Sequence, residues 1–443
     1  MTVESAVLFG VAALCLLQSA VFKRDFFGPV SVYLFSQCIS LGVAWLRLSP
    51  LMSDWGFSSW AIFAGSALAF AAGAACARLS WAARHPGEAI PADAPSRKLL
   101  AKANSGYDWS LHLALTVGTF LFFCAGVVAE YRELGTLIAL SDDVGQLMTI
   151  EGAPKIGLWG YPRSSGPLVC MLCAVGCFRS LNPRRGLRVA FKALFLASLT
   201  LGTLALPNRL SLFAVLFTTA YLFNLAARRV RPAFILAGVV AAVACFVAFA
   251  NLKGQTIILR AAADKAVWKV PYEYLANNWW NLDYAVNRKN DEFSQPPLLG
   301  LDAAHGAFEL VPWYSRIYRT YHWDGIFNEH STKTPHLNTM PYQWGLYKDF
   351  GFAGCVAGPF LLGLFLGTLF AIVRARGKVL PLLLYAHLLF YVTLWFYDEF
   401  WSSVMHVAWI AVTVLVPCVC ARRAALPAEP RPDSEAAALD QGP

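Results

Sequence analysis

Charged side chains are scarce in this sequence: they make up 14% of its residues, while 57% are hydrophobic. A water-soluble domain carries roughly 25% charged residues, so this shortage argues against a soluble globular protein. Apolar stretches recur along the whole chain, and the mean hydropathy is +0.51. A soluble domain on a single anchor is therefore excluded too, and we expect an all-α polytopic membrane protein.

Basic residues are missing ahead of the first apolar run, 6–22. Glu4 precedes this run, and Lys23 and Arg24 follow it. A signal peptide has the reverse order, so we expect a retained first helix with an external N-terminus. The eleven cysteines all fall in apolar segments, where we interpret them as small packing residues. The spacing of Cys170, Cys173 and Cys177 comes without His or carboxylate neighbours, so we expect no metal ion.

Crossing the membrane takes about 20 mostly apolar residues for roughly 30 Å of hydrocarbon. By this rule the sequence predicts eleven spans, at 6–22, 30–46, 58–77, 110–129, 160–178, 189–206, 210–227, 232–250, 351–373, 379–396 and 402–421. The predicted organisation is eight spans in 1–250, a loop of about 100 residues at 251–350, three spans in 351–421 and a disordered tail at 422–443.

Lysine and arginine are distributed unequally between the two sets of loops. With eleven spans, one side holds 21 of these residues, and the other side holds five outside the long loop. The basic side is expected to be cytoplasmic, which puts the C-terminus inside and the long loop on the external side. This bias also accounts for the net charge of +9, so nucleic acid is not an expected partner.

The long loop combines aromatic side chains with arginines. Residues 267–287 are too polar to span and predict an amphipathic helix lying at the lipid interface. Further along, Trp313 and Tyr314 are followed by Arg316 and Arg319, and such a mixture suits sugars and phosphates. An interfacial aromatic belt is the alternative interpretation of the same residues.

Two arginines stand at external helix ends, where cations are rare. Arg209 lies in the tight turn 207–211 between two spans, next to a helix N-terminus, where a cation gains nothing from the helix dipole. We therefore predict that Arg209 binds a diphosphate, with snorkelling to lipid phosphate as the alternative. Arg163, in 160–165, is a second candidate of the same kind.

The stretch HLNTMPYQWGLYKDFGFAG, residues 336–354, leads from the loop into a glycine-rich span. A neutral imidazole such as that of His336 can accept a hydroxyl proton near pH 7, and Asp349 is a second candidate base. The four glycines Gly354, Gly358, Gly363 and Gly367 form two small-xxx-small pairs that predict close helix contacts.

Together, the arginine turn, the long loop and this glycine-rich stretch resemble the oligosaccharide repeat-unit polymerases, the O-antigen polymerases of the Wzy type. The residues that carry the resemblance are Arg209, Asn338, Thr339, Tyr347, Asp349, Phe350, Gly351 and Gly354. His336 ahead of the Gly-x-x-Gly at 351–354 is also similar to the O-antigen ligases, although Leu337 departs from their pattern.

The resemblance implies a metal-independent glycosyltransferase with a GT-C-like fold and no cofactor. Its substrate would be an undecaprenyl-diphosphate-linked oligosaccharide in the membrane lipid, and a chain-length regulator protein is a partner that the resemblance leaves open. His336, Arg209 and Asp349 are the expected catalytic residues. The expected substrate contacts are Arg163, Trp313, Tyr314, Arg316, Arg319, Asn338, Tyr342, Tyr347 and Lys348.

Three other functions stay open. The first is an O-antigen ligase-like glycan transferase. The second is a metal-dependent GT-C transferase, which needs an early external carboxylate; Asp25 lies on the cytoplasmic side by charge count, and Asp142 and Asp143 come late. The third is a lipid-linked oligosaccharide flippase or other transporter, against which we count the near absence of ionisable residues within the predicted spans.

Overall fold

The computed structural model describes residues 2–21, 25–48, 54–86, 95–134, 160–205, 209–231, 233–241, 269–287, 299–308, 339–398 and 403–425, with single residues 137, 244 and 400. Within these ranges every regular element is a helix. The first half of the chain contributes α1 (Val3–Val21), α2 (Pro29–Ala44), α3 (Phe57–Arg84), α4 (Arg97–Ala103), α5 (Trp109–Leu134), α7 (Gly160–Arg163), α8 (Gly166–Cys177), α9 (Arg185–Ala205) and α10 (Arg209–Ala226). The second half contributes α13 (Lys269–Asn287), α14 (Leu301–Phe308), α17 (Gln343–Arg376), α18 (Val379–Leu394) and α19 (Val404–Ala425).

Six of these helices are long and apolar enough to cross a membrane, namely α1, α3, α5, α9, α17 and α19. The shorter apolar helices α2, α8, α10 and α18 coincide with further predicted spans. The chain is thus an all-α, membrane-embedded protein in its described part. Residues 233–241 of the eighth predicted span are helical, but the rest of that span lies almost wholly outside the described residues, so the count of eleven stays a prediction.

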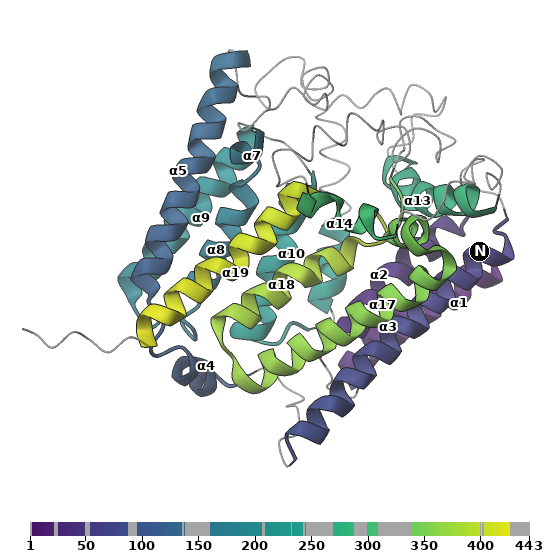
Figure 1. Ribbon diagram of the computed structural model, residues 1–443, viewed down its shortest axis with the longest axis horizontal. Coiled ribbons are helices and arrows are strands. Elements are labelled where there is room, and N and C mark those ends of the chain that lie inside the picture. Colours follow the sequence, from purple (N-terminus) through teal and green to yellow (C-terminus); the bar gives the residue numbers. More distant parts are fainter. Residues whose placement is uncertain are drawn as a thin grey trace, which may run out of the picture.

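The bundle has two distinct ends (Figure 1). We call one the α13 end, because α13 contacts the last turn of α2 there: the Tyr272 hydroxyl donates a hydrogen bond to the Ala44 carbonyl at 3.1 Å. The other is the α4 end, where the Asn104 side chain donates to the Gly377 carbonyl at 2.9 Å, just after α17. The short α4 and the loop helix α13 therefore lie at opposite ends, as the predicted alternation of loops requires.

Two expectations about the helices need correction. The predicted span 160–178 is broken into α7 and α8, with Pro167 in the first turn of α8. Twelve residues rise about 18 Å, so α8 alone is shorter than the hydrocarbon layer. The helix at 267–287 forms as α13, but residues 276–283 are buried on every side, so this stretch lacks the exposed face of an amphipathic surface helix.

The pairing of α3 with α17 shows what the glycines do. An added Cβ at Gly73 would lie 2.0 Å from the Phe360 carbonyl oxygen, and one at Gly363 would lie 2.1 Å from that of Phe70. The two backbones therefore touch, which confirms close packing for the pair Gly363 and Gly367. Gly354 and Gly358 instead face Leu346, in the first part of α17 itself.

Candidate functional site

The candidate site lies at the α13 end of the bundle, where Asp283 of α13 bonds the start of α3. The Asp283 carboxylate is 1% exposed and accepts hydrogen bonds from the Gly56 amide at 2.9 Å, the Ser59 hydroxyl at 2.8 Å and the Asn287 side chain at 2.8 Å. Gly56 and Ser59 stand at the start of α3. The carboxylate thus fixes α13 to a membrane-spanning helix and caps that helix favourably at its positive end.

A second set of contacts ties α13 to the stretch that precedes α17. The Asn281 side chain donates to the Thr339 carbonyl at 3.0 Å, and the Thr339 hydroxyl donates to Asn278. Another side chain of α13, the Trp279 indole, donates to the Ser40 hydroxyl of α2 at 3.0 Å. Residue 339 is therefore held by α13, three residues after His336.

The first part of α17, Gln343–Phe350, is built as a separate segment, which we call the lead-in. Gly351 has φ 62° and ψ −150°, a conformation that is essentially restricted to glycine, and it bends α17 at this point. The predicted span began at 351, whereas the helix begins at Gln343, eight residues earlier.

Aromatic side chains surround the lead-in. Tyr342, expected to contact substrate, is fully buried: its ring stacks on Trp395 at 4.8 Å between centroids, and its hydroxyl lies 2.9 Å from that of Tyr33. Tyr347 and Lys348 are half-buried and both contact the Trp344 ring. In this structure Tyr342 is thus a core residue, whereas Tyr347 and Lys348 remain partly accessible.

Asp349 has a definite structural task. Its carboxylate accepts a hydrogen bond from the Ala303 amide at 2.9 Å, its own carbonyl accepts one from Leu299 at 3.0 Å, and the residue is fully buried. Ala303 lies in the first turn of α14, where an acidic group satisfies unpaired amides and the helix dipole. Asp349 therefore positions α14 over the lead-in.

The arginines that were predicted to bind substrate lie in different settings. Arg163 in α7 forms an ion pair with Glu130 of α5 at 3.2 Å, and their side chains are 11% and 6% exposed. Its charge is therefore largely compensated. Arg209 is the first residue of α10, as the predicted tight turn requires, but its side chain lies outside the described residues. Also outside them are Trp313, Tyr314, Arg316, Arg319, His336 and Asn338.

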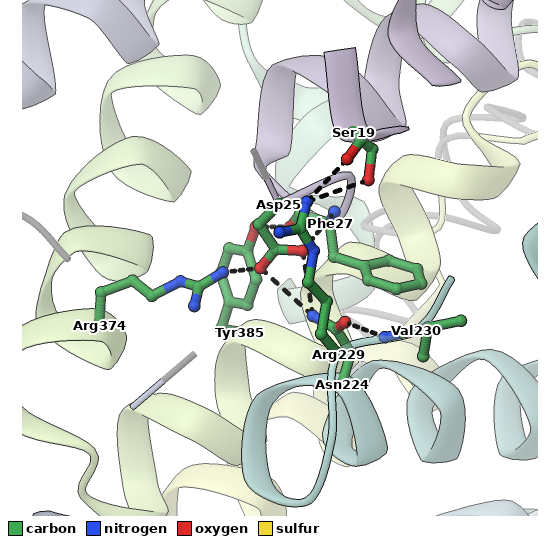
Figure 2. A network of polar contacts seen from close by, with 8 residues as sticks. All are labelled: Ser19, Asp25, Phe27, Asn224, Arg229, Val230, Arg374 and Tyr385. Carbon is green, nitrogen blue, oxygen red and sulfur yellow. Dashed lines mark hydrogen bonds and ion pairs between the residues drawn. The ribbon is translucent and has the colours of Figure 1, made fainter. Parts of the chain in front are cut away.

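A buried ionic network that the sequence analysis missed lies at the last turn of α17, and Figure 2 shows it from close by. Asp25, which follows α1, forms an ion pair with Arg374 of the last turn of α17; the side chains are 7% and 1% exposed. Asn224, near the end of α10, donates to both Asp25 oxygens at 3.1 and 3.2 Å, and the Phe27 amide donates to one of them at 3.1 Å.

Neighbouring residues extend this network to α1 and α18. The Arg229 guanidinium donates to the Ser19 carbonyl at 2.9 Å, and the Tyr385 hydroxyl of α18 donates to the Phe27 carbonyl at 2.6 Å (Figure 2). One polar cluster thus joins four helices, α1, α10, α17 and α18. Since Asp25 is engaged by Arg374 and Asn224, the structure gives this carboxylate structural partners rather than the open coordination that a metal-dependent transferase needs.

Three histidines in the spans were also missed. His112, His387 and His406 are 0%, 0% and 3% exposed, in α5, α18 and α19. Each falls inside a predicted span, so the expectation that the spans carry almost no ionisable residues is wrong. The signal was present in the sequence, because a histidine within an apolar run such as 379–394 has to find polar partners inside the protein.

Comparison with known proteins assigns neither a family nor a function to the chain. The chain matches no protein-family model, no curated protein and no solved structure, so its resemblance to the polymerases rests on the motif residues alone.

Proposed function

We propose that this chain is a metal-independent membrane glycosyltransferase with a GT-C-like fold. It polymerises undecaprenyl-diphosphate-linked oligosaccharide repeat units at the membrane face on which α13 lies. In the predicted orientation this is the periplasmic face of the bacterial inner membrane. The product is a surface polysaccharide.

The observation that carries the proposal is that the polar contacts among the loop helices and the lead-in gather at one end of the bundle. The loop helices α13 and α14, the lead-in of α17 and residue Thr339 meet at one end of the bundle, linked through Asp283, Asn281 and Asp349. At the other end, the Asp25–Arg374 cluster joins the four helices α1, α10, α17 and α18. A rigid platform on one face suits a reaction between two lipid-carried substrates in one leaflet.

The chemistry follows from the charges involved. An acceptor sugar hydroxyl attacks the anomeric carbon of the donor, the bond to the diphosphate oxygen breaks, and the diphosphate takes the electron pair. A guanidinium stabilises the charge that builds on this leaving group, and a base takes the hydroxyl proton. We assign the first role to Arg209 and the second to His336. Asp349, because it is buried against α14, is assigned the positioning of the platform.

The test is polymerisation by the purified protein in lipid nanodiscs supplied with lipid-linked repeat units. The wild type is expected to give a ladder of chain lengths. Arg209→Ala should lower the rate roughly ten- to hundredfold, the equivalent of losing one charge-assisted contact of about 1.5–3 kcal/mol in the transition state. Arg132→Ala is the matched control, since Arg132 is an exposed arginine at the end of α5 on the same predicted side. Equal rates for both variants would contradict the diphosphate role.

The buried histidines favour a second candidate, a transporter of lipid-linked oligosaccharide. Ionisable residues in membrane helices commonly mark transport pathways. Cells that lack the protein distinguish the two functions. A glycan ladder collapsed to a single repeat on the external leaflet indicates a polymerase, whereas accumulation of precursor on the cytoplasmic leaflet indicates a transporter.

A further inference from the structure

A continuous hydrogen-bonded chain runs between α18 and α19 inside the bundle. The Thr413 hydroxyl lies 3.0 Å from Nδ1 of His387, Nε2 of His387 lies 2.9 Å from the Tyr391 hydroxyl, and that hydroxyl lies 3.2 Å from Nδ1 of His406. His387 and Tyr391 are one turn apart on α18, and His406 and Thr413 are two turns apart on α19. Two matching helix faces thus form the chain.

Every member of this chain both donates and accepts hydrogen bonds. A neutral imidazole has one N–H and one bare nitrogen, and a hydroxyl has a proton and lone pairs. The third buried histidine gives the contrast. His112 contacts the Tyr107 hydroxyl at 2.7 Å on Nδ1 and the Leu172 carbonyl at 3.1 Å on Nε2, and a carbonyl cannot donate a proton. His112 is thus fixed in one tautomer, whereas His387 and His406 are not.

The surroundings of the chain are mainly aromatic. The ring of His406 lies 5.1 Å from Phe400 and 5.0 Å from Trp409, and that of His387 lies 6.4 Å from Trp409. Ionisable side chains on several helices packed around α18 and α19 have described partners outside the relay. Tyr33 of α2 contacts Tyr342, His112 of α5 contacts Tyr107, and Tyr221 of α10 contacts Thr393 of α18. On α17, Asp349 is bonded to Ala303 and Arg374 is paired with Asp25. The packed helix α8 carries Cys170, Cys173 and Cys177, and the packed helix α14 carries His305.

We propose that His406, Tyr391 and His387 form a proton relay from the α14 side of the bundle toward its middle. A proton that binds Nε2 of His406 makes that ring an imidazolium. Its Nδ1 proton then passes to the Tyr391 oxygen while the Tyr391 hydroxyl proton passes to Nε2 of His387. His406 becomes neutral, Tyr391 is unchanged, and His387 carries the added proton with Thr413 as its hydrogen-bond partner. Only N–H and O–H bonds form and break.

The relay has a direction because its ends lie at different depths. His406 is near the start of α19, against which α14 packs, whereas His387 and Thr413 are near the middles of their helices. In this proposal His406 is the end of the relay that takes up the proton, and His387 is its interior end. This inference does not depend on the glycosyltransferase proposal, since it concerns proton movement alone.

The test is nitrogen-15 NMR of histidine-labelled protein in nanodiscs, with the eight histidines assigned by single His→Gln variants. In the wild type, the ring nitrogens of His387 and His406 should show exchange between protonation sites that changes with pH, while those of His112 stay at fixed-tautomer positions. In Tyr391→Phe, His406 should keep its exchange and His387 should become fixed.

His112→Gln controls for the loss of a buried imidazole and should leave the exchange of His387 unchanged. If wild-type His387 keeps one fixed tautomer at every pH at which the protein stays folded, the relay is refuted. The wild-type pH series decides this without any variant, so misfolding of Tyr391→Phe would not obscure the result.

Discussion

The roles of Arg374 and Asp25 could not be predicted from their positions in the sequence. The sequence places both at span ends on the basic side, where charges are ordinarily solvated. The structure buries both and pairs them. Withdrawing two charges from water costs several kcal/mol per ion, which the pairing and the additional Asn224 hydrogen bonds offset. The cluster therefore depends on all of its members being present.

Removing one partner of this pair should be severely destabilising. Arg374→Met keeps the apolar volume but leaves the Asp25 carboxylate buried without its cation, at an expected cost of about 3–5 kcal/mol. The double variant with Asp25→Asn should recover most of this loss, because no buried charge remains. The measurement is the midpoint of denaturant-induced unfolding in mixed micelles.

The exposed pair Arg47–Asp54 is the matched control for this prediction. Its side chains are 38% and 82% exposed, so Arg47→Met should change stability by less than about 1 kcal/mol. A double variant no more stable than Arg374→Met alone would mean that Arg374 contributes through packing rather than through its charge.

At the scale of elements, the contact between α3 and α17 offers the clearest prediction. Gly73→Ala places a methyl group 2.0 Å from the Phe360 carbonyl oxygen, so the helices must separate, at an expected cost of about 1–3 kcal/mol. Gly118→Ala is the control within a spanning helix, because nothing lies within 4 Å of its added Cβ. That variant should be neutral or up to about 1 kcal/mol more stable. Equal unfolding midpoints for the two variants would contradict backbone contact between α3 and α17.

The sequence predicted helix positions well wherever apolar length alone decides them. The helices α1, α3, α5, α9 and α19 each begin within about four residues of a predicted span. The break between α7 and α8 and the early start of α17 were not predicted, because they depend on local backbone geometry at Pro167 and Gly351. Periodicity and hydropathy do not report such geometry.

The candidate site was predictable only in part, for a related reason. Residue type and spacing drew attention to the segment 336–354, and its described part contacts α13 through Thr339 and α14 through Asp349. Whether a polar residue contacts substrate or holds the fold depends on its neighbours in space. Tyr342 and Asp349 are buried against Tyr33 and α14, and no feature of the sequence indicated those contacts.

At the scale of the whole molecule, the distribution of charge and the arrangement of the ends agree. The five basic residues expected outside include Arg47, which stands at the α13 end, and the basic set expected inside includes Arg376 and Lys378, which stand at the α4 end. These three residues thus lie at opposite ends of the helix bundle, although hydropathy and charge counting made no use of three-dimensional contacts.

This agreement predicts which end faces the outside of the cell. In a variant whose native cysteines are replaced by serine, Asp54→Cys marks the α13 end and Lys378→Cys marks the α4 end; both positions are exposed. A membrane-impermeant thiol reagent added to intact spheroplasts should label Asp54→Cys and leave Lys378→Cys unlabelled until the membrane is opened. The reverse pattern would place the loop helices in the cytoplasm, where a glycan polymerase acting on exported repeat units cannot work, and labelling of both would contradict the separation of the two ends. The excess of lysine and arginine at the α4 end makes the first outcome the expected one, because basic loops are retained on the cytoplasmic side during insertion.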